Sequence, residues 1–213
     1  ADVSHTTATD TITAHGLTSD GGFMGVVKRS ADASSTGGSW YVDHPALSGS
    51  YNILFDTNAA EQNATVYSDV DATNITISKD APTGTYRLIV WAEKHGLISL
   101  QGYTGNGSAD GPMVYHGGRP LLCVTKRISG STGQWFAVDR ERSPINQIAD
   151  FLTIDSPDAE TTAHASVRSD YLAVGAKIRG NNVQINTASA PYLTLTYLDA
   201  AVGGTGIVEG TAV

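Results

Sequence analysis

The sequence contains a single cysteine, Cys123, among its 213 residues. One cysteine excludes a disulfide within the chain, so folding must rest on the burial of apolar side chains. Cys123 lies in the apolar run Leu-Leu-Cys-Val, and this setting predicts a small buried side chain in preference to a catalytic thiol. Folding without disulfides suits synthesis in a reducing cytoplasm, which is where we expect the chain to be made.

Basic residues are also scarce. The chain has 13 Lys and Arg against 21 Asp and Glu, which gives a formal net charge of −8. Nucleic-acid binding draws most of its affinity from Lys and Arg that neutralise phosphates. The scattered basic residues therefore predict no nucleic-acid partner. No apolar run approaches the roughly 20 residues of a membrane-spanning helix, so we expect no membrane partner.

The sequence has none of the short signatures of the common catalytic and cofactor sites. We find no Gly-x-Ser-x-Gly, no phosphate-binding loop and no dinucleotide glycine pattern. The six histidines are isolated and lack the spacing of a zinc site. We therefore expect no cofactor and no enzymatic activity.

Two acidic patterns have a functional interpretation and a structural one. Asp69 and Asp71 open the stretch Asp-Val-Asp-Ala-Thr-Asn, which resembles a calcium loop, but Asn74 stands where such a loop needs glycine. We favour a turn between strands and keep the two aspartates as a weak metal candidate. Asp139 and Glu141 could form a glycosidase pair. The arginines beside them favour a structural Asp–Arg turn.

The glycine-, serine- and threonine-rich sequence alternates short β-prone runs with turn-forming clusters. This pattern predicts an all-β fold of the β-sandwich or jelly-roll type. One segment, residues 143–152, has helical character, with Pro144 at a first helical position and Ile145 and Ile148 on one face. Strands are predicted over residues 11–15, 23–29, 39–44, 51–56, 64–70, 74–78, 86–93, 120–127, 134–139, 151–155, 171–178, 181–186 and 192–199.

The two halves of the chain match along their length, in the same order and with a drift of a few loop residues. We interpret the match as an internal duplication of a unit of about 95–100 residues, used as two pseudo-symmetric copies. The matched positions are Lys28 and Arg29 with Lys126 and Arg127, Trp40 with Trp135, Glu61 with Glu160, and Trp91 with Tyr197. Recurrence at matched positions favours packing over a glycan-stacking role for the tryptophans, so we predict that all three are mostly buried.

The duplication suggests a division of the chain. Residues 1–20 are predicted to form an N-terminal arm with the first strand, residues 21–100 the first copy, residues 101–200 the second copy and residues 201–213 a C-terminal tail. Both flanks are poor in core residues, and we expect them to become ordered on a neighbouring subunit. If the chain binds a ligand or partner through a loop, Tyr103, Asn106 and Asp110 in the long polar loop are the candidates.

The second half carries a resemblance to a known module. It has Tyr-Thr-Gly-Asn-Gly at residues 103–107, Asp-Gly-Pro at residues 110–112, and a Pro-led apolar strand ending in Lys-Arg at residues 120–127. A Trp strand, an Asp-x-x-Arg turn and an Ala-Glu pair follow. This pattern resembles a repeat module of tailed-bacteriophage virion surface proteins, found especially in marine and cyanobacterial phages. The first half resembles its partner form and departs at Gly22, where the module has the proline seen here as Pro120.

The resemblance implies a place in a phage particle and implies no reaction. We expect a non-enzymatic virion structural protein, made in the bacterial cytoplasm, such as a head decoration protein or a small surface-appendage subunit. Its partners would then be other virion proteins and copies of itself. One alternative is a tail-fibre or receptor-binding module that recognises a host surface polysaccharide. A weaker alternative is a glycan depolymerase.

Overall fold

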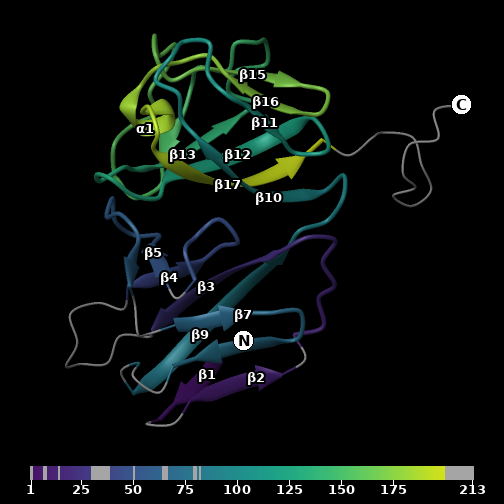
Figure 1. The fold of residues 1–213 in the computed structure, drawn as a ribbon, viewed down its shortest axis with the longest axis vertical. Helices are drawn as coiled ribbons and strands as arrows, with labels where there is room; N and C mark the ends of the chain where they lie inside the picture. Colours follow the sequence, from purple (N-terminus) through teal and green to yellow (C-terminus); the bar gives the residue numbers. More distant parts are fainter. Residues whose placement is uncertain are drawn as a thin grey trace, which may run out of the picture.

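Antiparallel strands build two consecutive units, which are stacked one above the other (Figure 1). The structure is a computed structural model of the chain. The structure describes residues 2–6, 9–13, 15–29, 39–49, 51–63, 67–78, 81 and 83–199. Within them the fold is all-β, with one helix of four residues. No helix in these ranges is long and apolar enough to cross a membrane.

Each unit contains one large and one small antiparallel sheet. The first unit comprises β1 (Asp2–His5), β2 (Asp10–Thr13), β3 (Phe23–Arg29), β4 (Trp40–Asp43), β5 (Tyr51–Leu54), β6 (Gln62–Asn63), β7 (Tyr67–Val70), β8 (Asn74–Ile77) and β9 (Gly84–Ala92). The second unit comprises β10 (Ile98–Thr104), β11 (Met113–Tyr115), β12 (Pro120–Arg127), β13 (Trp135–Asp139), β14 (Leu152–Thr153), β15 (Ser169–Leu172), β16 (Gly175–Ile178), α1 (Val183–Asn186) and β17 (Pro191–Leu198).

The strand orders of the two units are the same. The large sheets have the orders β1-β9-β3-β4-β5-β6 and β10-β17-β12-β13-β14, and the small sheets have the orders β2-β8-β7 and β11-β16-β15. Replacing each strand of the first unit by its equivalent reproduces the second unit, except for β6. The predicted all-β fold of two pseudo-symmetric copies is therefore confirmed.

Strand register matches the sequence repeat residue by residue. Lys28 lies opposite Trp40, and the equivalent Lys126 lies opposite Trp135. In the same way Met24 lies opposite Trp91, and Leu122 lies opposite Tyr197. A slip of one residue would turn each side chain to the other face of its sheet, so equal registers place the repeated residues in equivalent environments.

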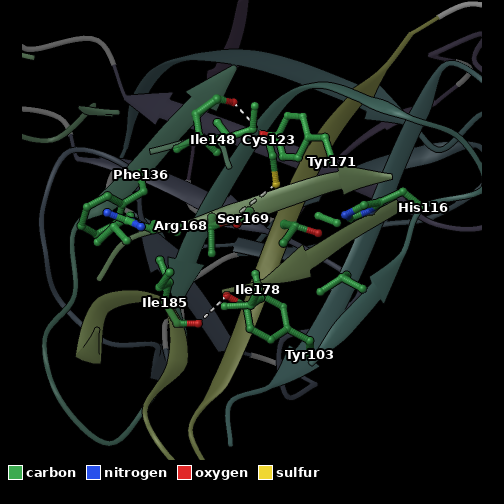
Figure 2. Close-up of a pocket in the computed structure, with 16 residues that line it drawn as sticks. Tyr103, His116, Cys123, Phe136, Ile148, Arg168, Ser169, Tyr171, Ile178 and Ile185 are labelled. Atoms are coloured by element: carbon green, nitrogen blue, oxygen red, sulfur yellow. Dashed lines mark hydrogen bonds between the residues drawn. The ribbon is translucent and has the colours of Figure 1, made fainter. Parts of the chain in front are cut away.

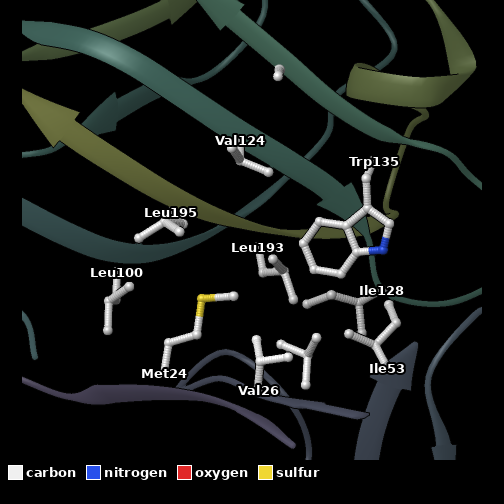
Figure 3. Packing of buried hydrophobic residues seen from close by; sticks show 11 residues of the cluster. Met24, Val26, Ile53, Leu100, Val124, Ile128, Trp135, Leu193 and Leu195 are labelled. Atoms are coloured by element: carbon white, nitrogen blue, oxygen red, sulfur yellow. The ribbon is translucent and has the colours of Figure 1, made fainter. Parts of the chain in front are cut away.

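The two large sheets face each other, and the central hydrophobic core lies between the units (Figure 3). Met24, Val26 and Ile53 of the first unit meet Val124 and Trp135 of the second, among other residues. Met24, Ile53 and Trp135 have no solvent exposure. The side chains of the core that joins the units are thus as fully buried as those in the interior of either unit.

Each large sheet also packs its other face against the small sheet of its own unit. In the first unit Phe23 and Val27 of β3 pack with Ile75 and Ile77 of β8. In the second unit Phe136 of β13 packs with Val114 of β11 and other residues. The chain thus forms four layers of sheet. Strands β3 and β12 are buried on both faces, which explains why they read as nearly continuous apolar runs.

Residues 143–152 do not form the predicted helix. In the structure Ser143 Oγ accepts the N–H groups of Ala149 and Asp150 at 3.2 and 3.1 Å. A serine side chain that bonds to nearby backbone competes with helical hydrogen bonds, which is the physical reason for the error. Ile145 is 79% exposed, so the predicted apolar face is not buried as a unit.

Residues 181–186 also differ from the prediction, because α1 replaces the predicted strand. The Asn182 side chain caps this helix by accepting the N–H of Gln184 at 2.9 Å. The strand predicted over residues 151–155 is reduced to the two residues of β14. The strand predicted over residues 171–178 is a hairpin of β15 and β16.

The N-terminal residues belong to the first unit. Strand β1 pairs with β9 along its whole length, and β2 pairs with β8 in the small sheet. Buried His5 accounts for part of this docking, because its Nδ1 lies 2.5 Å from Asp10 Oδ2 and its Nε2 lies 3.1 Å from the carbonyl oxygen of Ala81. Residues 2–5 and 10–13 therefore do not form an arm that orders on a neighbour, and the first unit starts before residue 21. The predicted tail, residues 201–213, lies outside the described residues.

Candidate functional site

The polar loop between β10 and β11 is held in place by one buried side chain. Asn186, at the end of α1, has no solvent exposure. Its Oδ1 accepts the N–H of Asn106 at 2.8 Å, and its Nδ2 donates to Ser108 O at 2.7 Å and to Gly180 O at 2.9 Å. A bond from Asn106 Nδ2 to Asp110 O at 3.0 Å closes the loop on itself. This loop is built as part of the framework.

The three loop candidates lie in different settings. Tyr103 stacks on Tyr192 with ring centroids 4.9 Å apart, and its hydroxyl donates to Ile185 O at 2.7 Å. Burial raises the pKa of Tyr103 well above its usual value. The Asp110 side chain is 78% exposed and pairs with Lys177 at 2.9 Å. Asn106 and Asp110 are therefore brought together, whereas Tyr103 points into the second unit.

Lys126 is the most unusual of the repeated residues because its charged side chain is fully buried between the units. Its Nζ donates to the carbonyl of Gly133 and lies 6.0 Å from the centre of the Trp135 ring. Burial lowers the pKa of Lys126 to about 8, and the negative charge of Asp155 opposes that shift. Asp155 in turn accepts the backbone N–H of Trp135 at 3.0 Å.

The first unit repeats this arrangement in a more exposed form. Lys28 Nζ lies 4.6 Å from the centre of the Trp40 ring, and Asp56 accepts the backbone N–H of Trp40 at 3.2 Å. The prediction of a buried Trp135 is confirmed, since its exposed fraction is 0%. Trp40 and Trp91 are half-buried against the same core.

The remaining repeated residues also make contacts within the chain. Glu61 donates its backbone N–H to Ile128 O at 2.7 Å, across the junction of the units. Glu160 pairs with Arg142 at 3.2 Å. Arg127 donates from Nε to Ser129 O at 3.0 Å. The side chain of Arg29 lies outside the described residues.

Side-chain hydrogen bonds tie the two units together beyond their shared core. Trp135 Nε1 donates to Leu54 O at 2.8 Å. Trp91 Nε1 donates to the Tyr197 hydroxyl at 2.7 Å, so two residues at equivalent repeat positions bond to each other. Buried His44 adds a bond from Nε2 to Thr194 O at 3.1 Å. Contact between equivalent positions is what an isologous, two-fold arrangement produces.

The Asp71 carboxylate is used by its own turn. It accepts the N–H groups of Thr73 and Asn74, both at 2.7 Å, and also the Asn74 side-chain amide at 3.0 Å. The bond from Thr73 N–H contributes most to lowering the pKa of Asp71 to about 2. The turn between strands is therefore confirmed. The Asp69 side chain lies outside the described residues, within which no group of three metal-ligating side chains gathers.

Asp139 forms the Asp–Arg turn that the sequence favours over a glycosidase pair. Its carboxylate accepts the backbone N–H of Arg142 at 2.8 Å and pairs with the Arg142 guanidinium. Glu141 is exposed on the same turn.

A small, partly open cavity of about 20 Å³ lies between the sheets of the second unit (Figure 2). His116, Cys123, Tyr103 and Tyr171 are among the residues that line it. The predicted burial of Cys123 is confirmed, and this burial raises the pKa of its thiol. His116 Nδ1 lies 3.2 Å from Ser99 Oγ, and burial lowers the pKa of this histidine to about 4. The volume suffices for about one water molecule.

An open cleft of about 440 Å³ lies at the junction of the units, beside β10. Its walls are Pro45 and Ala46 from the first unit, Leu100 to Thr104 from β10, Ile128, Pro191 and Tyr192. None of these residues is charged. Sequence reasoning missed this cleft because it forms only where the loop after β4 meets β10. A sequence signal for it is the uncharged stretch from residue 95 to residue 109.

Comparison with known proteins gives one match. A family model described as a domain of unknown function (DUF7483) matches residues 2–200. The match spans both units, so the duplicated pair as a whole corresponds to this family. No curated protein and no solved structure matches the chain.

Proposed function

We propose that this chain, which belongs to the DUF7483 family, is a non-enzymatic structural protein of a tailed-bacteriophage particle. The two forms that we favour are a head decoration protein and a small surface-appendage subunit. The family assignment carries no activity with it. Two features support the proposal: the repeated motif resembles the phage module, and the residues of that motif make structural contacts within the fold.

One observation carries the proposal: the residues that bear the resemblance hold the chain together. Asn186 holds Asn106 in place by a hydrogen bond. Lys126 and Trp135 are buried between the units. The Asp139 carboxylate bonds to Arg142. A motif whose residues make contacts within the chain has a structural role. Such a role suits a subunit of a particle that is assembled from many copies.

Quantitative mass spectrometry of purified phage particles tests the proposal. The chain should be present, and its copy number distinguishes the two forms. A number that matches the count of capsid subunits indicates decoration, whereas a number that matches the tail symmetry indicates an appendage. Absence of the chain from purified particles would contradict the proposal.

The open cleft favours a second candidate, a receptor-binding module for a host surface polysaccharide. Its volume of about 440 Å³ falls within the size range of ligand sites, and its walls carry no charged side chain, which suits a ligand without charge. Binding of purified host polysaccharide that is lost in Thr104→Trp, which fills the cleft, would support this candidate. Release of reducing ends from the same polysaccharide would instead indicate a depolymerase and contradict a non-enzymatic role.

A further inference from the structure

Strand β10 is the edge of its large sheet, and over residues 100–104 no strand pairs with its outer side among the described residues; at its first residue, Ile98 exchanges backbone hydrogen bonds with Lys94. The strand pairs with β17 on one side and ends the order of the large sheet on the other. It has seven residues, whereas the other strands at sheet edges have two to four. Natural proteins keep edge strands short because a long free edge offers its backbone to another strand. The short edges here follow that rule, and β10 does not.

Strand β10 also lacks the other features that protect an edge. Its sequence, Ile-Ser-Leu-Gln-Gly-Tyr-Thr, has no lysine and no proline, and its register with β17 is continuous. The nearest charged residues along the chain are Lys94 and Asp110. Lysine, proline and bulges are the usual means of blocking edge pairing. Their absence from this one long edge favours pairing of the edge with another strand.

The hydrogen-bonding pattern shows which backbone groups are available. Leu198 donates its N–H to Leu97 O at 2.9 Å, and Gly105 donates its N–H to Ala190 O at 2.8 Å. The backbone N–H and C=O groups of the odd-numbered residues of β10 therefore point toward β17, and those of the even-numbered residues point toward the free edge, since bonding alternates along an antiparallel strand. At 3.4 Å, Glu93 Oε1 accepts the N–H of Leu100. The Leu100 carbonyl and both backbone groups of Gly102 and Thr104 remain, and no partner for them lies among the described residues.

A second copy of β10 fits these groups. In an antiparallel pair centred on Gly102, the Gly102 residues of the two copies would exchange N–H···O bonds. The Thr104 N–H of each copy would donate to the Leu100 carbonyl of the other. Strand β10 itself carries no charged side chain, although each chain has a net charge of −8. The Leu100 N–H of each copy stays with its own Glu93, so the Thr104 carbonyl opposite it would remain unpaired. Gly102 and Thr104 are exposed, and the open cleft lies beside them.

We propose that β10 pairs with β10 of a second copy of this chain about a two-fold axis at Gly102, so that the large sheets of two second units become one continuous sheet. The pairing gives the proposed structural role a specific partner. Its test needs only the purified chain, so a failed dimer and a failed virion assignment are separate results.

Sedimentation of the purified full chain tests the pairing. The wild type should form dimers. Thr104→Lys should be monomeric because it adds a charge to the edge, and Thr104→Pro should be monomeric because it removes a free N–H while leaving the bonds to β17 intact. The matched control Thr11→Lys, at an exposed position on the short edge strand β2, should dimerise like the wild type. Hydrogen exchange at Gly102 should be slow in the wild type and fast in both Thr104 variants, and exchange at position 104 should be slow in the wild type and fast in Thr104→Lys.

Three outcomes would overturn the proposal. The first is a wild type that stays monomeric up to about 1 mM, where an interface worth about 4 kcal/mol would be half occupied. The second is a dimer that persists in both Thr104 variants. The third is a dimer that is lost only when residues 201–213 are deleted, because the added strand would then be the C-terminal segment.

Discussion

At the scale of single residues, equivalent side chains of the two units differ in how deeply they are buried. Trp135 is fully buried and bonds across the junction, whereas the equivalent Trp40 is half-buried. We predict that Trp135→Ala lowers the free energy of unfolding by about 3–5 kcal/mol and that Trp40→Ala lowers it by less. Urea unfolding of both variants measures the difference. Equal losses would show that Trp135 has no special place in the junction.

His44 gives a prediction for pH. Its Nδ1 accepts the Ala46 N–H at 3.0 Å and its Nε2 donates to Thr194 O, so the buried ring is neutral. Burial lowers its pKa from 6.5 to about 4, against the opposing effect of the Thr194 carbonyl. Between these values the unfolded chain binds the proton and the folded chain does not. Stability should therefore fall as pH drops from 6.5 to 4, by about 3 kcal/mol from this group.

Urea unfolding at several pH values between 4 and 7 measures this dependence. His44→Gln should reduce the slope of stability against pH in that window. His95→Gln, at an exposed position, is the control and should leave the slope unchanged. A His44→Gln slope equal to that of the wild type would contradict the assignment.

At the scale of elements, the glycine at position 22, where the second copy has Pro120, has a steric cause. A Cβ atom at Gly22 would lie 2.4 Å from Pro45 Cγ, and the Gly22 N–H donates to Glu93 Oε2 at 3.1 Å. Proline fits neither condition. We predict that Gly22→Pro costs about 2–4 kcal/mol from overpacking and the lost bond. Adding Pro45→Ala should restore part of the loss in thermal unfolding, and no recovery would contradict the steric explanation.

The loop between β10 and β11 gives a second prediction for an element. Asn186→Asp would place a carboxylate oxygen against the carbonyls of Ser108 and Gly180, which now accept from the amide. We expect a loss of at least about 3 kcal/mol, because buried acceptors would be left without donors. Hydrogen exchange of residues 105–111 should become faster. Unchanged exchange would show that Asn186 does not hold the loop.

Sequence reasoning predicts the strands where the pattern of apolar residues is strong and fails where single side chains decide. Strands β3, β9, β12 and β17 and the pairing of the two copies follow from periodicity and repetition. The helix predicted at residues 143–152 is wrong because Ser143 captures the backbone of Ala149 and Asp150. Asn182 starts a helix where the pattern predicts a strand. Such local hydrogen bonds leave no trace in hydrophobic periodicity.

The same limit applies to the candidate site. The turns at Asp71 and Asp139 could be predicted because each depends on neighbours in the sequence, and the burial of Trp135 could be predicted because a tryptophan recurs at the matched repeat position. The cleft between the units could not be, since Pro45 and Gly102 meet only through the packing of one unit on the other. Residues of the Tyr103–Gly107 phrase are fixed by Asn186, about 80 positions away along the chain.

At the scale of the whole molecule, the central claim is that the two units form one body. Their shared core is as dry as any other in the described residues, and Trp91, Trp135 and His44 bond across it. Neither unit could separate without exposing Met24, Ile53 and other core residues to water. The claim underlies the proposed role as a rigid building block.

Differential scanning calorimetry of the full chain tests this claim most directly. One transition should be seen, with equal calorimetric and van't Hoff enthalpies, and Trp135→Ala should move that whole transition to lower temperature. Two separate transitions, with only one of them moved by Trp135→Ala, would contradict the account.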